Sequence, residues 1–174
     1  ADKVCSGQSA CFAKKEWLGA RSAMAFPLHL ISNQPRTRLH SQLDHGSYSR
    51  QSKIKGREVM WMHPEQAALR QIEDGDIVRV FNNRGACLAA AKLTREIRTD
   101  VVILPTGAWY DPVDPAGRTS LDSHGNPNIL TQDVPSSQLA QACAAQSCLV
   151  DVELYPGLLP PITVFDQPPT HQRP

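Results

Sequence analysis

The chain has 174 residues, of which 18 are basic and 17 acidic, so its net charge at neutral pH is +1. This length is typical of one domain that can bury a core without disulfides or metals, and the balanced charge and few aromatic residues argue against a nucleic-acid partner. No apolar run approaches the roughly 18 residues of a membrane span, so we expect no membrane segment. A cleaved secretory signal would leave no trace in this sequence, so a cytoplasmic and a periplasmic location both stay open.

Five cysteines, at positions 5, 11, 87, 143 and 148, follow no pattern of metal ligands. No CxxC pair occurs, so zinc and iron–sulfur sites have little support, and we expect no metal ligand in this chain. Cys5 with Cys11, and Cys143 with Cys148, are close enough in sequence to form disulfides. Free thiols in a reducing compartment are the simpler interpretation.

The first 25 residues show no clear periodicity, and Phe12–Ala20 favours one or two helical turns. A strand is expected at Leu28–Ser32, where large residues alternate with smaller or polar ones. Pro35 stops its ladder, because proline has no N–H to donate. The residues from Asn33 to Gln42 are dense in hydrogen-bonding side chains. Such a loop at the end of a core strand suits a polar, phosphate-bearing ligand, although a solvated surface loop is the commoner use of this composition.

The next segment, Gly46–Gly56, is polar and basic. We expect it to be a mobile surface loop. Its charges at Arg50, Lys53 and Lys55 are interpreted as solvated, rather than as contacts to a ligand or to a neighbouring domain.

Strands and one helix alternate through the middle of the chain. Pro64 at the first helical position favours a helix that starts after His63, and its apolar spacing continues to Gln71. His63 is expected to start this helix rather than to bind a ligand, and Asp74 and Asp76 to make local hydrogen bonds in a turn rather than to act in catalysis. The expected strands are Val59–Met62, Ile77–Phe81, Ala86–Leu93 and Asp100–Leu104, with a hairpin turn at Asn82–Gly85 and with the last strand buried on both faces.

A long connection, Pro105–Asn128, follows these strands and is rich in proline, glycine, aspartate and serine. Connections of this length are usually functional or disordered. Trp109 and Tyr110 offer flat apolar faces, which suit the wall of a heterocycle pocket and plain core filling equally well. The elements expected after it are a short helix at Ser136–Ala145, a strand at Leu149–Leu154 and a final strand at Ile162–Phe165. Some six short strands and one good helix indicate a mainly β fold, a closed or nearly closed barrel with small helices outside.

The stretch SNQPRTRLHSQLD, residues 32–44, resembles the segment that opens the C-terminal domain of the dimethyl sulfoxide reductase family of molybdenum enzymes. EWLGA before it resembles the connector into that domain. MHPEQAALRQIEDGDIVRVFNNRG, GAWYDP and NILTQDVPSSQLAQ, followed by Gln146, resemble later parts in the same order. The resemblance extends from Glu16 to Pro169, is far more specific than one short motif, and is nearest to the biotin sulfoxide and trimethylamine N-oxide reductases.

The resemblance implies a double-psi β barrel (an aspartate-decarboxylase-like barrel) with short peripheral helices over residues 26–169, preceded by a connector at 1–25 and followed by a tail at 170–174. It also implies contacts to bis(molybdopterin guanine dinucleotide). Asparagine and glutamine amides match a pterin or guanine edge. Ala145 stands where the family frequently has glycine, however, and Ala142-Cys143 stands where Gly-Asn is frequent, so the added Cβ atoms hinder a close backbone approach there. The implied cofactor-binding residues are Gln34, Leu39, His40, Ser41, Asn128 and Gln146, to which we add Trp109 as a pocket wall.

The function implied is that of the C-terminal cofactor-binding domain of a molybdenum-dependent reductase of biotin sulfoxide, trimethylamine N-oxide or dimethyl sulfoxide. The alternatives are the same domain of a formate dehydrogenase or nitrate reductase, and a stand-alone barrel module without cofactor. The expected partners are the remaining N-terminal domains, which in the family supply the metal ligand and much of the dinucleotide site. We therefore expect the isolated chain to hold no cofactor, to contain no catalytic residue and to be inactive.

Overall fold

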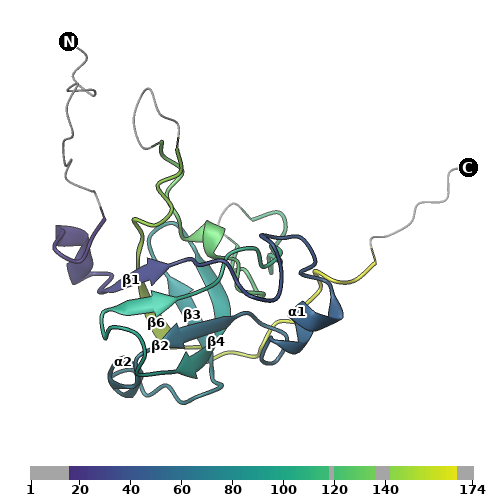
Figure 1. Ribbon diagram of the computed structural model, residues 1–174, viewed down its shortest axis with the longest axis horizontal. Coiled ribbons are helices and arrows are strands. Elements are labelled where there is room, and N and C mark those ends of the chain that lie inside the picture. Colours follow the sequence, from purple (N-terminus) through teal and green to yellow (C-terminus); the bar gives the residue numbers. More distant parts are fainter. Residues whose placement is uncertain (1–15, 118–119, 136–141, 168–174) are drawn as a thin grey trace, which may run out of the picture.

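Six strands close into a barrel in the computed structural model, which describes residues 16–117, 120–135 and 142–167 (Figure 1). Around the barrel the order is β1–β5–β2–β4–β3–β6. β1 is parallel to β5 and β2 is parallel to β4, whereas the other neighbours are antiparallel. Parallel neighbours need crossover connections, so the mainly β double-psi barrel that the resemblance implied is confirmed. The strands are β1 (Leu28–Ile31), β2 (Val59–Met62), β3 (Ile77–Phe81), β4 (Ala86–Leu93), β5 (Val101–Ile103) and β6 (Leu149–Leu154).

The barrel interior is filled by side chains that alternate along the strands, as the twofold repeat of a β-strand requires. In β1, buried Leu28 and Leu30 alternate with half-buried neighbours. In β4, six consecutive residues are buried. β5 alternates too, since Val102 is buried between half-buried Val101 and Ile103. The expectation that this strand is buried on both faces was therefore wrong.

The helix α2 (Pro64–Ala68) begins where the sequence indicated. Pro64 occupies the first turn, and the Nδ1 atom of His63 accepts a hydrogen bond from the Glu65 N–H at 3.3 Å. His63 is thus the N-cap, as expected. The helix ends at Ala68 rather than Gln71, whose backbone is left-handed (φ 56°).

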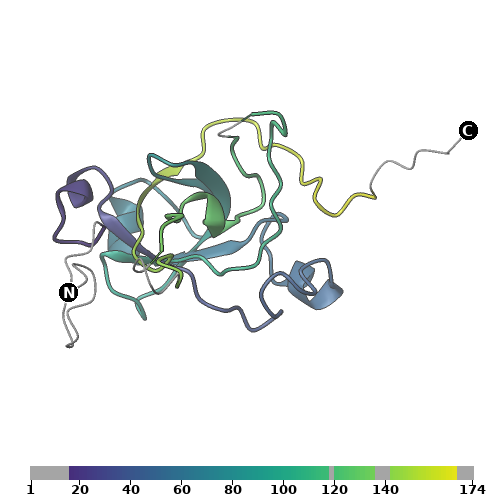
Figure 2. The same ribbon diagram turned by 90° about the horizontal axis from the view of Figure 1, so that it is seen from above.

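The segment at Gly46–Gly56 is not the mobile surface loop that its composition suggested. It contains the helix α1 (Ser47–Gln51), which lies beside the barrel in Figure 2. Ser49 on this helix is buried. The segment is instead held against the barrel by the side chains described below.

Other expected elements differ in detail. The final strand at Ile162–Phe165 is absent, because the Thr163 N–H donates to the carboxylate of Asp111 (2.8 Å) and joins no strand ladder. The helix expected at Ser136–Ala145 lies mostly outside the described residues, and residues 142–145 are not helical. Near the N-terminus a 3-10 helix, η1 (Arg21–Met24), follows a turn at residues 17–20. A second 3-10 helix is η2 (Pro127–Ile129).

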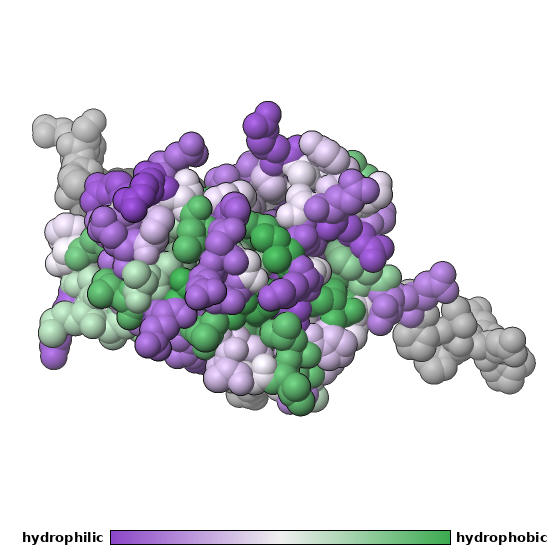
Figure 3. All heavy atoms as spheres, turned by 90° about the horizontal axis from the view of Figure 1, so that it is seen from below, coloured by the Kyte–Doolittle hydropathy of each residue, from purple (hydrophilic) through white to green (hydrophobic). Residues whose placement is uncertain are grey.

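The connector before β1 is attached to the barrel by Glu16. Its carboxylate pairs with the guanidinium of Arg84 and accepts the Leu149 N–H at 3.0 Å. On the face of the molecule seen in Figure 3, hydrophobic surface is divided by hydrophilic side chains. Within the described part of the chain, no helix has the length and apolar character needed to cross a membrane.

The filled interior makes a prediction about stability. Met60 on β2 is fully buried, whereas Met24 is 88% exposed. We expect Met60→Ala to lower the free energy of unfolding by about 2–5 kcal/mol, because it removes buried contacts and leaves a cavity, while Met24→Ala changes it by less than about 0.5 kcal/mol. Urea titration followed by circular dichroism measures both, and equal effects of the two substitutions would contradict the barrel core described above.

Candidate functional site

Two long loops leave the same end of the barrel because β1 and β5 run in parallel. We call residues 32–46 the first loop and residues 104–130 the second loop. The ladder between them continues past the strands, since the Leu104 N–H donates to the Ile31 carbonyl at 3.0 Å and the Thr106 N–H to the Asn33 carbonyl at 2.9 Å. Figure 1 shows the two loops on the same side of the molecule, between β1 and α1.

The first loop has a fixed internal shape. The Gln34 side chain donates to the Arg38 carbonyl at 2.6 Å and accepts from the His40 N–H at 3.3 Å. His40 (φ 49°) and Leu43 (φ 64°) have left-handed backbones, which residues other than glycine rarely adopt. Such strain persists only where the surroundings over-determine it, and it concentrates at ligand sites.

The second loop meets the first at Gly107. Its φ is +90°, and a Cβ placed on it would lie 1.8 Å from the His40 carbonyl oxygen. Only glycine allows the two backbones to approach this closely. Two residues later, the indole N–H of Trp109 donates to the Ser41 carbonyl at 2.7 Å.

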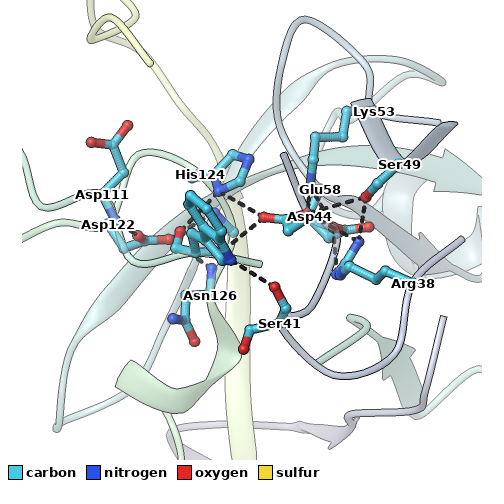
Figure 4. Close-up of polar contacts among 12 residues, drawn as sticks. Arg38, Ser41, Asp44, Ser49, Lys53, Glu58, Asp111, Asp122, His124 and Asn126 are labelled. Atoms are coloured by element: carbon cyan, nitrogen blue, oxygen red, sulfur yellow. Dashed lines mark hydrogen bonds and ion pairs between the residues drawn. The ribbon is translucent and has the colours of Figure 1, made fainter. Parts of the chain in front are cut away.

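Four charged side chains are buried beneath the first loop (Figure 4), and we call them the charge quartet: Arg38, Asp44, Lys53 and Glu58. The Lys53 Nζ atom lies 2.9 Å from a carboxylate oxygen of both Asp44 and Glu58. The Arg38 Nη2 atom lies 2.8 Å from Glu58 and donates to the Thr106 carbonyl at 2.8 Å. Two cations and two anions compensate one another, which buried charges require.

Lys53 was therefore wrongly interpreted as a solvated charge, because its side chain is only 1% exposed. Arg50 and Lys55, by contrast, are exposed. The Arg50 guanidinium lies over the ring of Phe165, 5.0 Å from its centroid.

Asp44 links the charge quartet to the second loop. One of its oxygens accepts from Ser49 (3.1 Å) and pairs with Lys53, and the other accepts the Trp109 N–H (2.9 Å). Burial alone would raise the pKa of Asp44, but the hydrogen bonds from Lys53 and the Trp109 N–H outweigh it and hold the pKa below its ordinary value. Asp44 is therefore ionised at neutral pH.

His124 is buried next to Asp44, with its Nδ1 atom 2.8 Å from the Trp109 carbonyl and 3.8 Å from the Asp44 carboxylate. Burial, together with the Lys53 charge, lowers the pKa of His124. The ring is accordingly neutral, and its Nδ1–H donates to the Trp109 carbonyl instead of forming an ion pair with Asp44.

Two more buried carboxylates shape the second loop. Asp122 accepts the N–H groups of Asp111 (2.8 Å), Gly125 (2.7 Å) and Asn126 (2.7 Å). Burial nevertheless keeps the pKa of Asp122 above its ordinary value. In Asp111 the hydrogen bonds from Thr163 and others overcome the effect of burial and lower the pKa. These bonds hold distant parts of the second loop together and attach it to the C-terminal segment at Thr163.

A cleft of about 460 Å³ lies between the two loops. Four of the residues predicted from the sequence line it, although they come from distant parts of the chain: His40, Ser41, Trp109 and Asn128. Trp109 lines the cleft and packs against His45 and Phe165, with ring centroids 5.3 and 5.9 Å away, but it is only half-buried and does not belong to the barrel core.

The other three predicted residues lie at the same end of the barrel but do not line the cleft. Gln34 holds the first loop together, and Leu39 is exposed on it. The Gln146 amide donates to the Ser32 carbonyl at 2.9 Å and accepts from the Ser32 N–H at 3.3 Å. Gln34 and Gln146 thus both form hydrogen bonds with the backbone of the first loop.

Four further residues that line the cleft were not predicted from the sequence, namely Thr106, Gly107, Ala108 and Asn126. Gly107 could have been found, since a glycine directly before two aromatic residues in a long loop suggests a close backbone approach. Thr106, Ala108 and Asn126 carry no comparable signal.

A larger hollow of about 730 Å³ lies beside α1 and is lined by His45, Arg50, Phe165 and others. None of the seven predicted residues lines it. Its cations are already engaged, Lys53 in the charge quartet and Arg50 over Phe165. We therefore place the candidate site in the smaller cleft.

Three of the five cysteines lie in the part of the chain that the structure describes. Cys87, Cys143 and Cys148 are free thiols, as the simpler interpretation held for the last two. Burial raises the pKa of Cys148 to about 11, so it stays protonated at neutral pH. Among residues 16–117, 120–135 and 142–167, no three histidine, cysteine, aspartate or glutamate side chains gather as metal ligands.

The buried histidine predicts how stability depends on pH. The folded chain excludes a proton from His124 that the unfolded chain accepts near its ordinary pKa of about 6.5. Stability is thus fully present above about pH 6.5 and falls on acidification, by at most about 1.4 kcal/mol per pH unit. Asp44, with its lowered pKa, adds a further loss below its ordinary pKa of 3.8.

We expect His124→Asn, which keeps a donor toward the Trp109 carbonyl, to flatten the free energy of unfolding between about pH 6.5 and 5. Urea titrations at several pH values measure it. An unchanged slope in this variant would show that His124 is not the group responsible.

Comparison with known proteins identifies the family of this chain. Residues 28–149 match the family model described as the molydopterin dinucleotide binding domain. A biotin sulfoxide reductase from Cereibacter sphaeroides is 46% identical over 153 residues, which cover 88% of this chain and 20% of that protein. A dimethyl sulfoxide/trimethylamine N-oxide reductase from the same organism is 40% identical, and a trimethylamine-N-oxide reductase from Salmonella typhimurium is 42% identical, each match covering 94% of this chain and 20% of the relative.

The chain therefore spans about a fifth of the length of the curated relatives that it matches. Among solved structures, acetylene hydratase from Pelobacter acetylenicus aligns with 84% of this chain and 21% of its own, with a TM-score of 0.66. At 15% identity this likeness shows the fold alone. With the family model covering the stretch from β1 to the start of β6, the chain belongs to the molybdopterin dinucleotide-binding domain family.

Proposed function

We propose that this chain is the C-terminal cofactor-binding domain of a molybdenum-dependent S- or N-oxide reductase, and that its cleft contacts bis(molybdopterin guanine dinucleotide). The observation that carries the proposal is the convergence of His40, Ser41, Trp109 and Asn128 on one cleft. Relatives named for biotin sulfoxide, dimethyl sulfoxide and trimethylamine N-oxide support an oxide as the substrate.

The cleft fits part of such a cofactor. Its volume of about 460 Å³ lies within the range of about 300–1,000 Å³ found for pockets that hold one small molecule, whereas two pterin dinucleotides are much larger. Gly107 lines the cleft without a side chain, and a Cβ there would collide with the His40 carbonyl oxygen. The remainder of the cofactor is then held by the other four-fifths of the enzyme.

The cleft residues have distinct parts in binding. The Asn128 amide offers a donor and an acceptor for a pterin or guanine edge, and the Ser41 hydroxyl and His40 imidazole offer donors for phosphate oxygens. Trp109 provides a flat wall. The cofactor supplies the redox chemistry when bound, and these residues bind and orient it. The same loop is held by Gln34 and Gln146, which hydrogen-bond to its backbone. Leu39 lies on this loop as well.

The chain divides accordingly into three parts. Residues 1–25 connect the barrel to the preceding domains, residues 26–169 form the cofactor-binding unit, and residues 170–174 are a tail. The ion pair of Glu16 with Arg84 and its bond from the Leu149 N–H support a connector that is fixed on the barrel.

Substitutions in the cleft test the proposal in the full-length enzyme. We expect His40→Ala and Asn128→Ala each to weaken cofactor binding by roughly 2- to 12-fold, the effect of losing one hydrogen bond of about 0.5–1.5 kcal/mol. Molybdenum and guanine nucleotide per chain, measured after partial release of the cofactor, report the change.

Asn83→Ala is the matched control, because Asn83 is an exposed asparagine on the hairpin between β3 and β4. It should retain cofactor as the wild type does. The proposal fails if all three variants hold the cofactor equally well.

A further inference from the structure

The charge quartet binds both ends of the short segment that carries His40 and Ser41. We call Arg38 and Asp44, the residues at these two ends, the anchors. Arg38, just before this segment, is bound to Glu58 and to the Thr106 carbonyl, each at 2.8 Å. Asp44, just after it, is bound to Lys53 and to the Trp109 N–H, each at 2.9 Å. Figure 4 shows Asp44 between His124 on one side and Arg38, Ser49 and Lys53 on the other.

The segment between Arg38 and Asp44 has a strained backbone. His40 and Leu43 within it both have positive φ angles, of 49° and 64°. Residues in this region return to a relaxed backbone when their surroundings no longer over-determine them. The shape in which His40 and Ser41 line the cleft therefore depends on the anchors.

Lys53 joins the two anchors, because its Nζ atom contacts the carboxylates of both Asp44 and Glu58 at 2.9 Å. Its side chain is 1% exposed and does not line the cleft. Any effect of Lys53 on a ligand in the cleft must consequently pass through the first loop.

We propose that Lys53 is a positioning residue of the cofactor site, which fixes the segment between Arg38 and Asp44 so that His40 and Ser41 meet the cofactor. This inference rests on the proposed function and deepens it. Removing an outer partner that orients a ligand-binding group commonly weakens binding by 10- to 100-fold in metal sites. A purely structural charge quartet would instead lower stability without changing how tightly the folded enzyme holds its cofactor.

The test compares three variants of the full-length enzyme: Lys53→Met, Lys53→Arg and Lys92→Met. Lys92 is the control, since it forms an exposed ion pair with Asp74 at 2.9 Å. The rate at which molybdenum and guanine nucleotide leave the enzyme is measured well below the melting temperature, per folded chain as judged by circular dichroism. We expect Lys53→Met to lose cofactor faster by on the order of 10-fold, Lys53→Arg to recover part of the retention, and Lys92→Met to match the wild type.

If Lys53→Met does not fold, the double variant Lys53→Met/Asp44→Asn removes one cation and one anion together and leaves Arg38 paired with Glu58. Faster cofactor loss from this folded variant supports the proposal. Wild-type retention in either folded variant, or failure of both to fold, overturns it.

Failure of the positioning role can be distinguished from failure of the proposed function. When His40→Ala and Asn128→Ala lose cofactor but folded Lys53→Met does not, only the positioning role is wrong. When all three retain it, the proposed cofactor site itself is wrong.

Discussion

The candidate site depends on the parallel pairing of β1 with β5. In this register His29 faces Val101 and Ile31 faces Ile103, and the ladder runs on until Thr106 bonds to Asn33. Two loops therefore begin side by side, although their residues are far apart in sequence. An antiparallel pairing of the same strands would place these loops at opposite ends of the barrel, and His40 could not share a cleft with Asn128.

Buried carboxylates fix the conformation of the loops by accepting hydrogen bonds, as the strand ladders fix the barrel. Ordering a residue costs roughly 1–2 kcal/mol in backbone entropy, and long loops have few regular hydrogen bonds to offset it. Asp44 and Asp122 each accept from two or more donors, including backbone N–H groups of the second loop. A site on irregular backbone becomes rigid in this way, and Asp44, whose pKa is lowered, makes its stability sensitive to acid.

The barrel was largely predictable because its signals are local. Alternation marks β1 and β6, and the turn at Asn82–Gly85 joins two strands that pair directly. Ile162–Phe165 shows the limit of this reasoning. It has the composition of a strand, but Thr163 bonds to the Asp111 side chain, a contact made 52 residues away that no local pattern reveals.

Apart from Trp109, the site was predictable only through the resemblance to a family, and then in part. His40, Ser41 and Asn128 reached the cleft, whereas Gln146 bonds to the Ser32 backbone. The burial of Lys53 was not predicted because its partners, Asp44 and Glu58, lie in different segments of the chain. A stretch of polar and basic residues does not by itself indicate which side chain is buried. Periodicity alone could not have assigned the crossed connections of the barrel or the approach of Gly107 to His40.

In the function we propose, the cleft between the two loops holds part of the dinucleotide cofactor. An experimental structure of the full-length enzyme with its cofactor bound measures this directly. We expect cofactor atoms within hydrogen-bonding distance, about 2.7–3.2 Å, of His40, Ser41 or Asn128, with Trp109 against a ring or ribose. A cofactor that leaves this cleft empty and sits instead in the hollow beside α1, next to Arg50 and Phe165, would contradict the account.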